Sequence, residues 1–261
     1  MPDITLIVST YNWPEALHLC LLSIKNQTVL PSEVIIADDG SKLETKNLID
    51  EFRKDFSIPL IHVWQEDLGF RKTIILNKSV KKASGEYIVQ IDGDVILDRH
   101  FIEDHQALAE PDVFVRGTRA HIDREMLPSL YEQSRIDFNF FSRGLINRFN
   151  AIRLPFLSFL FKKKSSRSES VRGSNLAFWK SDFILVNGYN NDLRGWGHED
   201  EELAARFVNN NKFKIAIKFK AVQYHLSHGQ LSLTHESEHA EEVKNTLNTK
   251  LKACHNGYEQ S

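Results

Sequence analysis

The 261-residue sequence has few cysteines, no long apolar run and no excess of charge of either sign. Cys20 and Cys254 are its only cysteines, so no disulfide framework is implied. No apolar stretch approaches the roughly 20 residues that cross a bilayer. The formal net charge of −2 gives no general attraction for nucleic acid. The first residues lack the basic and apolar regions of a signal peptide, so we expect a cytoplasmic protein.

Two phosphate-binding motifs are also missing. No Gly-x-Gly-x-x-Gly follows the first apolar run, and Gly-x-x-x-x-Gly-Lys-Ser/Thr occurs nowhere. The sequence therefore argues against a dinucleotide-binding dehydrogenase and against a P-loop nucleotidase.

Short apolar runs alternate with amphipathic helical patterns through the first hundred residues. This alternation predicts βαβ units and an α/β fold, with a mostly parallel central sheet and flanking helices. A further strand is expected at 213–219 and a polar helix at 234–253. The expected early strands are 4–9, 33–38, 59–64 and 87–91, and the expected early helices are 15–27, 43–56 and 73–83.

Polar residues follow three of these expected strands, at 10–12, 38–41 and 92–94. Ligands of parallel sheets bind beyond the carboxyl ends of the strands, so the three segments are expected to share one site. Asp92 and Asp94 follow a buried apolar run, with Gly93 allowing a phosphate to approach the backbone. Carboxylates in this position suit Mg2+ or Mn2+ held against a diphosphate.

The second informative segment is 196–203, Trp-Gly-His-Glu-Asp-Glu-Glu-Leu. A glycine-containing loop presents Trp196 and runs into acidic residues at the start of an amphipathic helix. A carboxylate there can take a proton from a nucleophile. His225 follows a strand-like run and is a candidate third metal ligand. One metal–phosphate site and one base make a group-transfer enzyme.

Two other enzyme classes stay open. Residues 235–239 fit His-Glu-x-x-His, which places two imidazoles and a glutamate on a helix in zinc proteases. The surrounding residues are acidic, without an apolar stripe, so we favour a charged surface helix. A nucleotidyltransferase on a related α/β fold also needs carboxylates and Mg2+, although this chain lacks its glycine-rich N-terminal phosphate loop.

Residues 138–172 differ from the rest of the chain. They hold seven of its seventeen Phe and eight Lys or Arg, and Glu169 is their only acidic residue. One interpretation is an inserted helical lobe that buries its aromatic side chains. The other is a surface that rests in the headgroup region of an anionic membrane. Its apolar part would be Phe149, Phe156, Phe159 and Phe161, flanked by Arg148, Arg153, Lys162, Lys163, Lys164 and Arg167.

Several short segments, taken in this order, resemble the inverting glycosyltransferases of family 2, which have the GT-A fold. The last of them resemble a galactosyltransferase-type C-terminal module that also occurs in chondroitin-polymerase-like enzymes. The resemblance covers nearly the whole chain, and the combination is specific although each piece alone is not. The matching segments are 9–12, 35–41, 67–71 with Asn77, 85–94 with the Asp-x-Asp, 172–175, 187–189 and 196–200.

The resemblance implies a role for each matching residue. Asp94 and the downstream His225 would bind the metal, with His228 as the alternative if the loop register differs by three. Asp200 would be the catalytic base, kept ionised by the helix dipole, and Glu199 would hold sugar hydroxyls. The implied nucleotide-sugar contacts are Thr10, Tyr11, Asn12, Asp38, Asp39, Arg71, Asn77, Asp92, Asn175 and Trp196.

The implied reaction is a single displacement in which a base deprotonates the acceptor hydroxyl while Mn2+ or Mg2+ stabilises the departing diphosphate. The implied donor is a UDP-sugar, and the acceptor a glycan or a lipid-linked glycan. Within a single GT-A domain, residues 1–98 would form the nucleotide-sugar half, ending in the Asp-x-Asp. Residues 99–261, with the insert 138–172, would form the acceptor-binding and catalytic half.

Overall fold

The N-terminal third of the chain folds as the alternating pattern predicts. The computed structural model describes residues 1–228 and 236–261. Each predicted early strand and helix is present, within three residues of its expected ends. The elements are β1 (Ile4–Thr10), α1 (Pro14–Lys25), β2 (Glu33–Asp38), α2 (Leu43–Arg53), β3 (Leu60–Trp64), α3 (Lys72–Lys82) and β4 (Tyr87–Asp92).

The central sheet has eight strands in the order β3-β2-β1-β4-β10-β6-β11-β9. Strands β1 to β4 are parallel, as expected. The later strand β10 is antiparallel to both of its neighbours, β4 and β6, so the sheet is mixed on this side. The added strands are β6 (Val113–Arg116), β9 (Lys164–Ser165), β10 (Asn175–Trp179) and β11 (Phe213–Ala216).

A second sheet, which the sequence did not predict, has the order β5-β12-β7-β8. Its strands have two to four residues, too few to show a period. Pairing of His225 with Val95 brings β12 beside the residue that follows Asp94. This sheet therefore joins two segments separated by 130 residues. Its strands are β5 (Val95–Leu97), β7 (Ala120–Ile122), β8 (Leu145–Ile146) and β12 (Gln223–Leu226).

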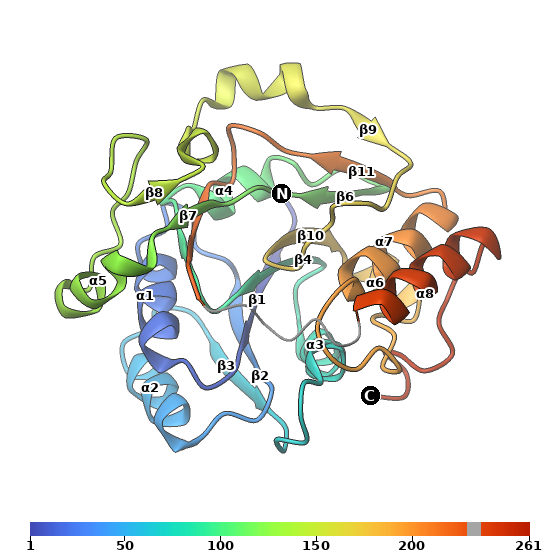
Figure 1. Cartoon of the computed structure of the whole chain (residues 1–261), viewed down its shortest axis with the longest axis horizontal. Coiled ribbons are helices and arrows are strands. Elements are labelled where there is room, and N and C mark those ends of the chain that lie inside the picture. Colours follow the sequence, from blue (N-terminus) through green and yellow to red (C-terminus); the bar gives the residue numbers. More distant parts are fainter. Residues whose placement is uncertain (229–235) are drawn as a thin grey trace.

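Helices cover both faces of the central sheet (Figure 1). Leu6 and Val8 of β1 face a core shared with α1 and α2, whereas Ile7 faces the opposite core with α3 and α7. Successive side chains of a strand point to opposite faces, so a strand buried on both sides reads as a continuous apolar run. Cys20 lies fully buried in the first core, as expected.

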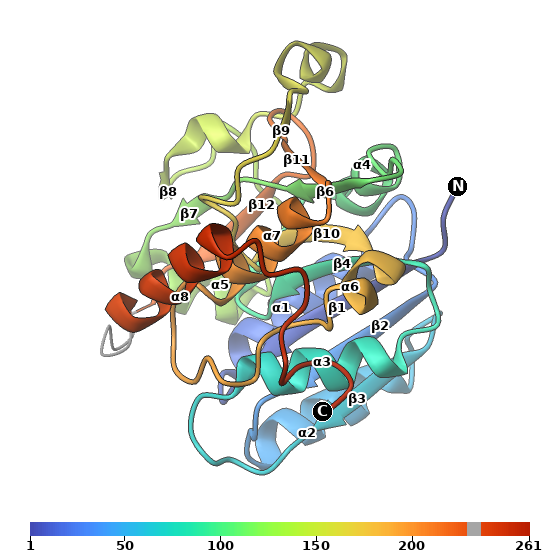
Figure 2. The ribbon, with the colours of Figure 1, turned by 90° about the vertical axis from the view of Figure 1, so that its right-hand side faces the viewer.

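The remaining helices complete the two faces, and Figure 2 shows α3, α6 and α8 on the viewer's side of the sheet. No helix in the described ranges is both long and apolar enough to cross a membrane. The other helices are α4 (Phe101–Gln106), α5 (Leu127–Gln133), α6 (Lys180–Leu185), α7 (Glu199–Asn209) and α8 (Glu236–Asn248), and the 3-10 helices are η1 (Arg124–Met126), η2 (Arg148–Ala151) and η3 (Pro155–Phe161).

Two sequence expectations had the wrong extent. The strand expected at 213–219 ends at Ala216, and the chain then turns through positive φ angles at Phe219 and Ala221. The C-terminal helix ends at Asn248 instead of near 253, and Lys250 also has a positive φ. Residues 234 and 235 of the expected helix lie outside the described residues.

Candidate active site

A cavity of about 940 Å³ lies at the carboxyl ends of β1 and β4. Its volume is in the range of sites for nucleotide-sized ligands. The two sheets, the Trp196 loop and the start of α7 all contribute to its walls. Ten predicted site residues line it: Thr10, Tyr11, Asn12, Asp39, Asp92, Asp94, Trp196, Glu199, Asp200 and His225.

Three potential metal ligands converge on one side of this cavity. The Nε2 atoms of His225 and His228 lie 3.4 and 3.5 Å from Asp94 Oδ2, and the ligand atoms of all three residues fall within 4.8 Å of one another. Asp94 Oδ1 is buried without a hydrogen-bond partner. Imidazole nitrogens and a carboxylate suit a divalent transition metal such as Mn2+. The residues therefore fit a cation, and both histidines, rather than one of the two alternatives, face Asp94.

Asp92, the first acid of the Asp-x-Asp, has different partners. Its Oδ1 accepts hydrogen bonds from Lys72 Nζ at 2.6 Å and from Ser9 Oγ at 2.9 Å. Burial opposes its charge, but Lys72 and Ser9 outweigh that effect and lower the pKa of Asp92. Gly93 packs closely, because a Cβ there would lie 3.0 Å from the carbonyl oxygen of Ser9. Close packing at the strand end thus accounts for this glycine.

The loop before α7 has the backbone that its glycines permit. Gly195, Gly197 and His198 all have positive φ, and His198 is the residue before the helix. Gly197 N–H donates to Glu199 Oε2 at 3.0 Å, and Glu199 is buried. The turn directs the first carboxylates of the helix into the cavity.

Asp200 is held on both oxygens. Its Oδ1 accepts from the Tyr189 hydroxyl at 2.7 Å, and its Oδ2 accepts from the Gly173 N–H at 2.6 Å. A Cβ on Gly173 would lie 2.6 Å from Asp200 Oδ1, so the absence of a side chain allows this approach. The carboxylate is therefore fixed in orientation before any ligand binds.

Burial changes the protonation of this acidic pair. Desolvation, together with the neighbouring charge of Asp200, raises the pKa of Glu199 to about 7. Burial also raises the pKa of Asp200, although Lys72, Tyr189 and Gly173 act in the opposite direction. Burial thus acts against the ionised form of Asp200, which the helix dipole was expected to favour. The pKa of Glu199 therefore lies near neutral pH, and the pKa of Asp200 is shifted upward, toward the range in which a general base works best.

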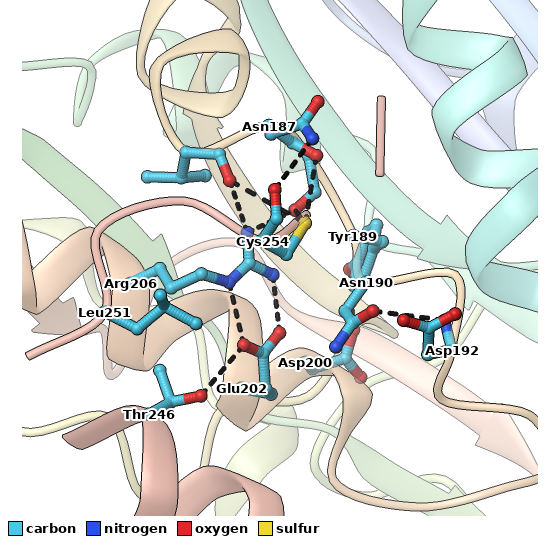
Figure 3. A network of polar contacts seen from close by, with 12 residues as sticks. Asn187, Tyr189, Asn190, Asp192, Asp200, Glu202, Arg206, Thr246, Leu251 and Cys254 are labelled. Atoms are coloured by element: carbon cyan, nitrogen blue, oxygen red, sulfur yellow. Dashed lines mark hydrogen bonds and ion pairs between the residues drawn. The ribbon is translucent and has the colours of Figure 1, made fainter. Parts of the chain in front are cut away.

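A buried network of polar contacts, shown in Figure 3, holds the segment that carries Tyr189 against α7. Arg206 pairs with Glu202 one turn along α7, and its Nη1 donates at 2.6 Å to the carbonyl oxygens of Val186 and Gly188. Gly188 precedes Tyr189, the residue that donates to Asp200. The network thus ties α7 to the segment that orients the carboxylate.

Four predicted donor-site residues lie outside the cavity lining. Asp38 is buried and accepts from the Ser41 N–H, with His62 Nε2 2.8 Å from its other oxygen. Asn77 bonds the main chain of Tyr189 on both sides. Both residues therefore make internal hydrogen bonds, and neither lines the cavity.

Arg71 and Asn175 are the other two. The Arg71 guanidinium donates to the carbonyl oxygen of Glu66, and its main-chain N–H donates to Asp39 Oδ2 at 2.7 Å. Asn175 is buried and bonds Thr118 and Ala221. Asp39 is therefore the member of the Asp38–Asp39 pair that faces the cavity, and Arg71 supports it from behind.

The His-Glu-x-x-His segment does not form a metal site in the part that is described. His239 is buried, and its Nδ1 donates at 2.6 Å to the carbonyl oxygen of Gly197. It supports the Trp196 loop, so the expectation of a purely solvated helix is wrong at this position. His235 lies outside the described residues. Within the described ranges, the group that suits a metal is Asp94, His225 and His228.

Three basic residues in the cavity wall were not singled out by sequence reasoning. Lys72 lies among Asp92, Glu199 and Asp200, and its side chain is 15% exposed. Arg119 and Arg172 line the same cavity, and Arg119 Nη1 lies 3.2 Å from Ser174 Oγ. Of these three residues, only Arg172 lies in a segment that the sequence analysis named, 172–175. Lys72 and Arg119 lie in polar stretches of sequence that resemble an exposed surface, and only the fold brings them both to the cavity.

Comparison with known proteins matches this chain to two family descriptions. "Glycosyl transferase family 2" matches residues 5–166, and "N-terminal domain of galactosyltransferase" matches residues 155–228. Validoxylamine A glucosyltransferase of Streptomyces hygroscopicus subsp. limoneus is 27% identical over 79% of this chain and 48% of its own length. Chondroitin synthase of Escherichia coli is 24% identical over 85% of this chain and 34% of its own.

A solved structure shares the fold. GalNAc-T7 with UDP, GalNAc and Mn2+ superimposes with a TM-score of 0.67 at 13% identity, covering 95% of this chain and 50% of that one. This likeness shows a GT-A glycosyltransferase fold, as the resemblance implied. The chain spans one third to one half of the length of the two curated relatives.

Proposed function

The chain belongs to glycosyl transferase family 2, and from that membership we propose that it transfers a hexose or N-acetylhexosamine from a UDP-sugar with inversion. The observation that carries the proposal is the cavity in which Asp94, His225 and His228 converge while Asp200 enters from α7. Nucleotidyl transfer and proteolysis have no comparable support. The galactosyltransferase-type match favours a galactose-configured donor.

The donor half of the cavity suits a nucleoside diphosphate. Thr10, Tyr11 and Asn12 form one wall and Asp39 stands at its end, where a carboxylate can accept from a ribose or a uracil. Arg119 and Lys72 supply positive charge for phosphate oxygens. Asp94 and the two histidines would hold Mn2+ or Mg2+, which when bound neutralises charge on the diphosphate leaving group.

Asp200 is the proposed base. In a single displacement it removes the proton of the acceptor hydroxyl as that oxygen bonds to the anomeric carbon and the bond to the diphosphate breaks. Tyr189 and Gly173 orient the carboxylate. Glu199, next to it and buried, would accept hydrogen bonds from sugar hydroxyls. The two carboxylates of a glycoside hydrolase serve a different reaction, in which the sugar is transferred to water.

The acceptor proposed is a glycan or lipid-linked glycan in polysaccharide biosynthesis, in keeping with a relative that is a chondroitin synthase. We assign donor binding to residues 1–98 and acceptor binding and catalysis to 99–261. Strands of the two parts pair directly, β4 with β10, so they act as halves of one domain.

The test combines binding and turnover. UDP with Mn2+ should raise the melting temperature of the wild type more than either ligand alone, because the two share the site. Asp94→Asn should remove the joint effect, while Asp55→Asn, which alters an exposed carboxylate outside the cavity, should retain it. Release of UDP from a panel of UDP-sugars then identifies the donor. Equal stabilisation of Asp94→Asn by UDP and Mn2+ would contradict the metal site.

A further inference from the structure

A ridge of large apolar side chains projects from the 138–172 segment. We define the aromatic ridge as Phe156, Phe159, Leu160 and Phe161 of η3, which are 69, 68, 63 and 44% exposed. Figures 1 and 2 both place η3 at one extremity of the molecule, beyond β9. Five of the seven Phe of the segment are exposed. The interpretation of 138–172 as a lobe that buries its aromatic side chains is therefore wrong.

The ridge is anchored to the body of the protein. Immediately before it, Arg153 forms two hydrogen bonds of 2.8 Å with the buried carboxylate of Asp104. Leu154 N–H donates to the carbonyl oxygen of Phe219 at 3.0 Å. Arg153 is thus part of the anchor, not of the exposed basic surface to which the sequence assigned it. The apolar side chains are held outward by a fixed base.

The surroundings of the ridge are strongly basic. Residues 138–172 hold eight basic and one acidic residue, a net charge of +7 in a chain of net charge −2. Lys162 and Lys164 share Glu110, whereas Lys163 and Arg167 have no carboxylate partner in the described ranges. A hollow of about 220 Å³ beside Phe159 is lined by Lys162, Lys218 and Lys220.

We propose that the aromatic ridge and its lysines form a peripheral docking surface for an anionic membrane. Large exposed apolar patches mark interaction sites. A projecting ridge inserts its side chains among lipid headgroups, while the surrounding cations pair with anionic lipids. The lysines beside the ridge, with Lys163 and Arg167, match an anionic surface in sign. The hollow with three lysines offers a place for one headgroup phosphate.

The segment also reaches the active site at both ends. Near its start, the carbonyl oxygen of Phe138 accepts from the Tyr224 hydroxyl at 2.9 Å, and Tyr224 precedes His225. At its end, Arg172 lines the cavity. The segment that carries the ridge is therefore connected at both ends to the surroundings of the cavity. The surface does not depend on the proposed reaction, since binding to vesicles needs no substrate.

The test is co-sedimentation of the whole chain with vesicles. The wild type should sediment with vesicles of phosphatidylcholine and phosphatidylglycerol, and much less with phosphatidylcholine alone. Phe156→Ser with Phe159→Ser should lower the partition coefficient by about tenfold or more, because two inserted rings are lost. Lys163→Gln with Arg167→Gln should lower it by a similar factor on anionic vesicles.

Matched control variants test whether the loss of vesicle binding is specific to the ridge or follows from removing any exposed apolar or basic residues. Ile184→Ser with Leu185→Ser removes two exposed apolar residues of α6, and Lys82→Gln with Lys252→Gln removes two cations elsewhere. Both should sediment as the wild type does. The proposal fails if the wild type does not sediment, or if the ridge variants bind as well as the controls. Concentration-dependent dimerisation that the ridge variants abolish, without vesicle binding, would assign the ridge to contact between copies instead.

Discussion

At the scale of single residues, Asp200 carries the sharpest expectation. Asp200→Asn keeps the shape but cannot take a proton, so kcat should fall by about 10² or more, the usual range for loss of a general base. The affinity for UDP should hardly change, because the residue faces the acceptor side. Steady-state kinetics and UDP titration measure the two effects. An active Asp200→Asn beside an inactive Glu199→Gln would exchange the two roles.

Lys72 should set the pH range of activity. The folded site holds protons on Glu199 and Asp200 more tightly than free carboxyls do, because burial raises both pKa values. Activity that needs ionised Asp200 should therefore be lost on acidification at a higher pH than a free aspartate would give, and Glu199, whose pKa is about 7, should ionise over the neutral range. Lys72 opposes this shift, so Lys72→Met should move the acidic limb of the kcat/KM profile to higher pH.

The control for that profile is Lys78→Met, on the same helix. Lys78 Nζ lies 3.2 Å from Gln65 Oε1, away from the acidic pair. Its profile should keep the wild-type midpoint. The interpretation is wrong if Lys72→Met leaves the midpoint unchanged, or if the wild-type profile is flat between pH 5 and 8.

At the scale of elements, the attachment of α7 depends on one buried ion pair. Arg206 and Glu202 are fully buried, and Thr246 of α8 donates to Glu202 Oε1 at 3.2 Å. Arg206→Met leaves Glu202 charged and without its partner, which should cost about 3–5 kcal/mol of unfolding free energy. Denaturant unfolding measures the loss.

An exposed ion pair provides the comparison for this prediction. Arg53 and Asp50 pair on α2, with side chains 45 and 37% exposed. Arg53→Met should cost much less, because solvent screens such pairs. Equal losses of unfolding free energy in the two variants would show that the buried pair of Arg206 and Glu202 stabilises the protein no more than an exposed pair does.

At the scale of the whole molecule, the two halves share one sheet. Because β10 and β6 come from the second half and lie beside β4, a fragment of residues 1–98 exposes the apolar edge and face of β4. We expect that fragment to lack a cooperative thermal transition, and the complete chain to show a single one by calorimetry. A sharp transition of the fragment would show that the donor half folds alone.

The sequence by itself determined the α/β class, the first seven elements and the three polar strand ends that meet at the cavity. Local periodicity is sufficient there, because each strand is long enough to show continuous burial and each helix shows its own stripe. The acidic loop before α7 could also be predicted, because its glycines and carboxylates are adjacent in the chain. These features depend on neighbours in sequence.

Tertiary structure decided the rest. The metal group needs β12 to pair with β5, and strands of three or four residues carry no detectable period. Asp38 and Asp39 have the same chemistry, adjacent positions and buried side chains, but Asp39 lines the cavity and Asp38 does not. Lys72, Arg119 and Tyr189 meet the carboxylates only through long-range packing. The raised pKa values of Glu199 and Asp200 likewise follow from burial, which only the tertiary structure produces.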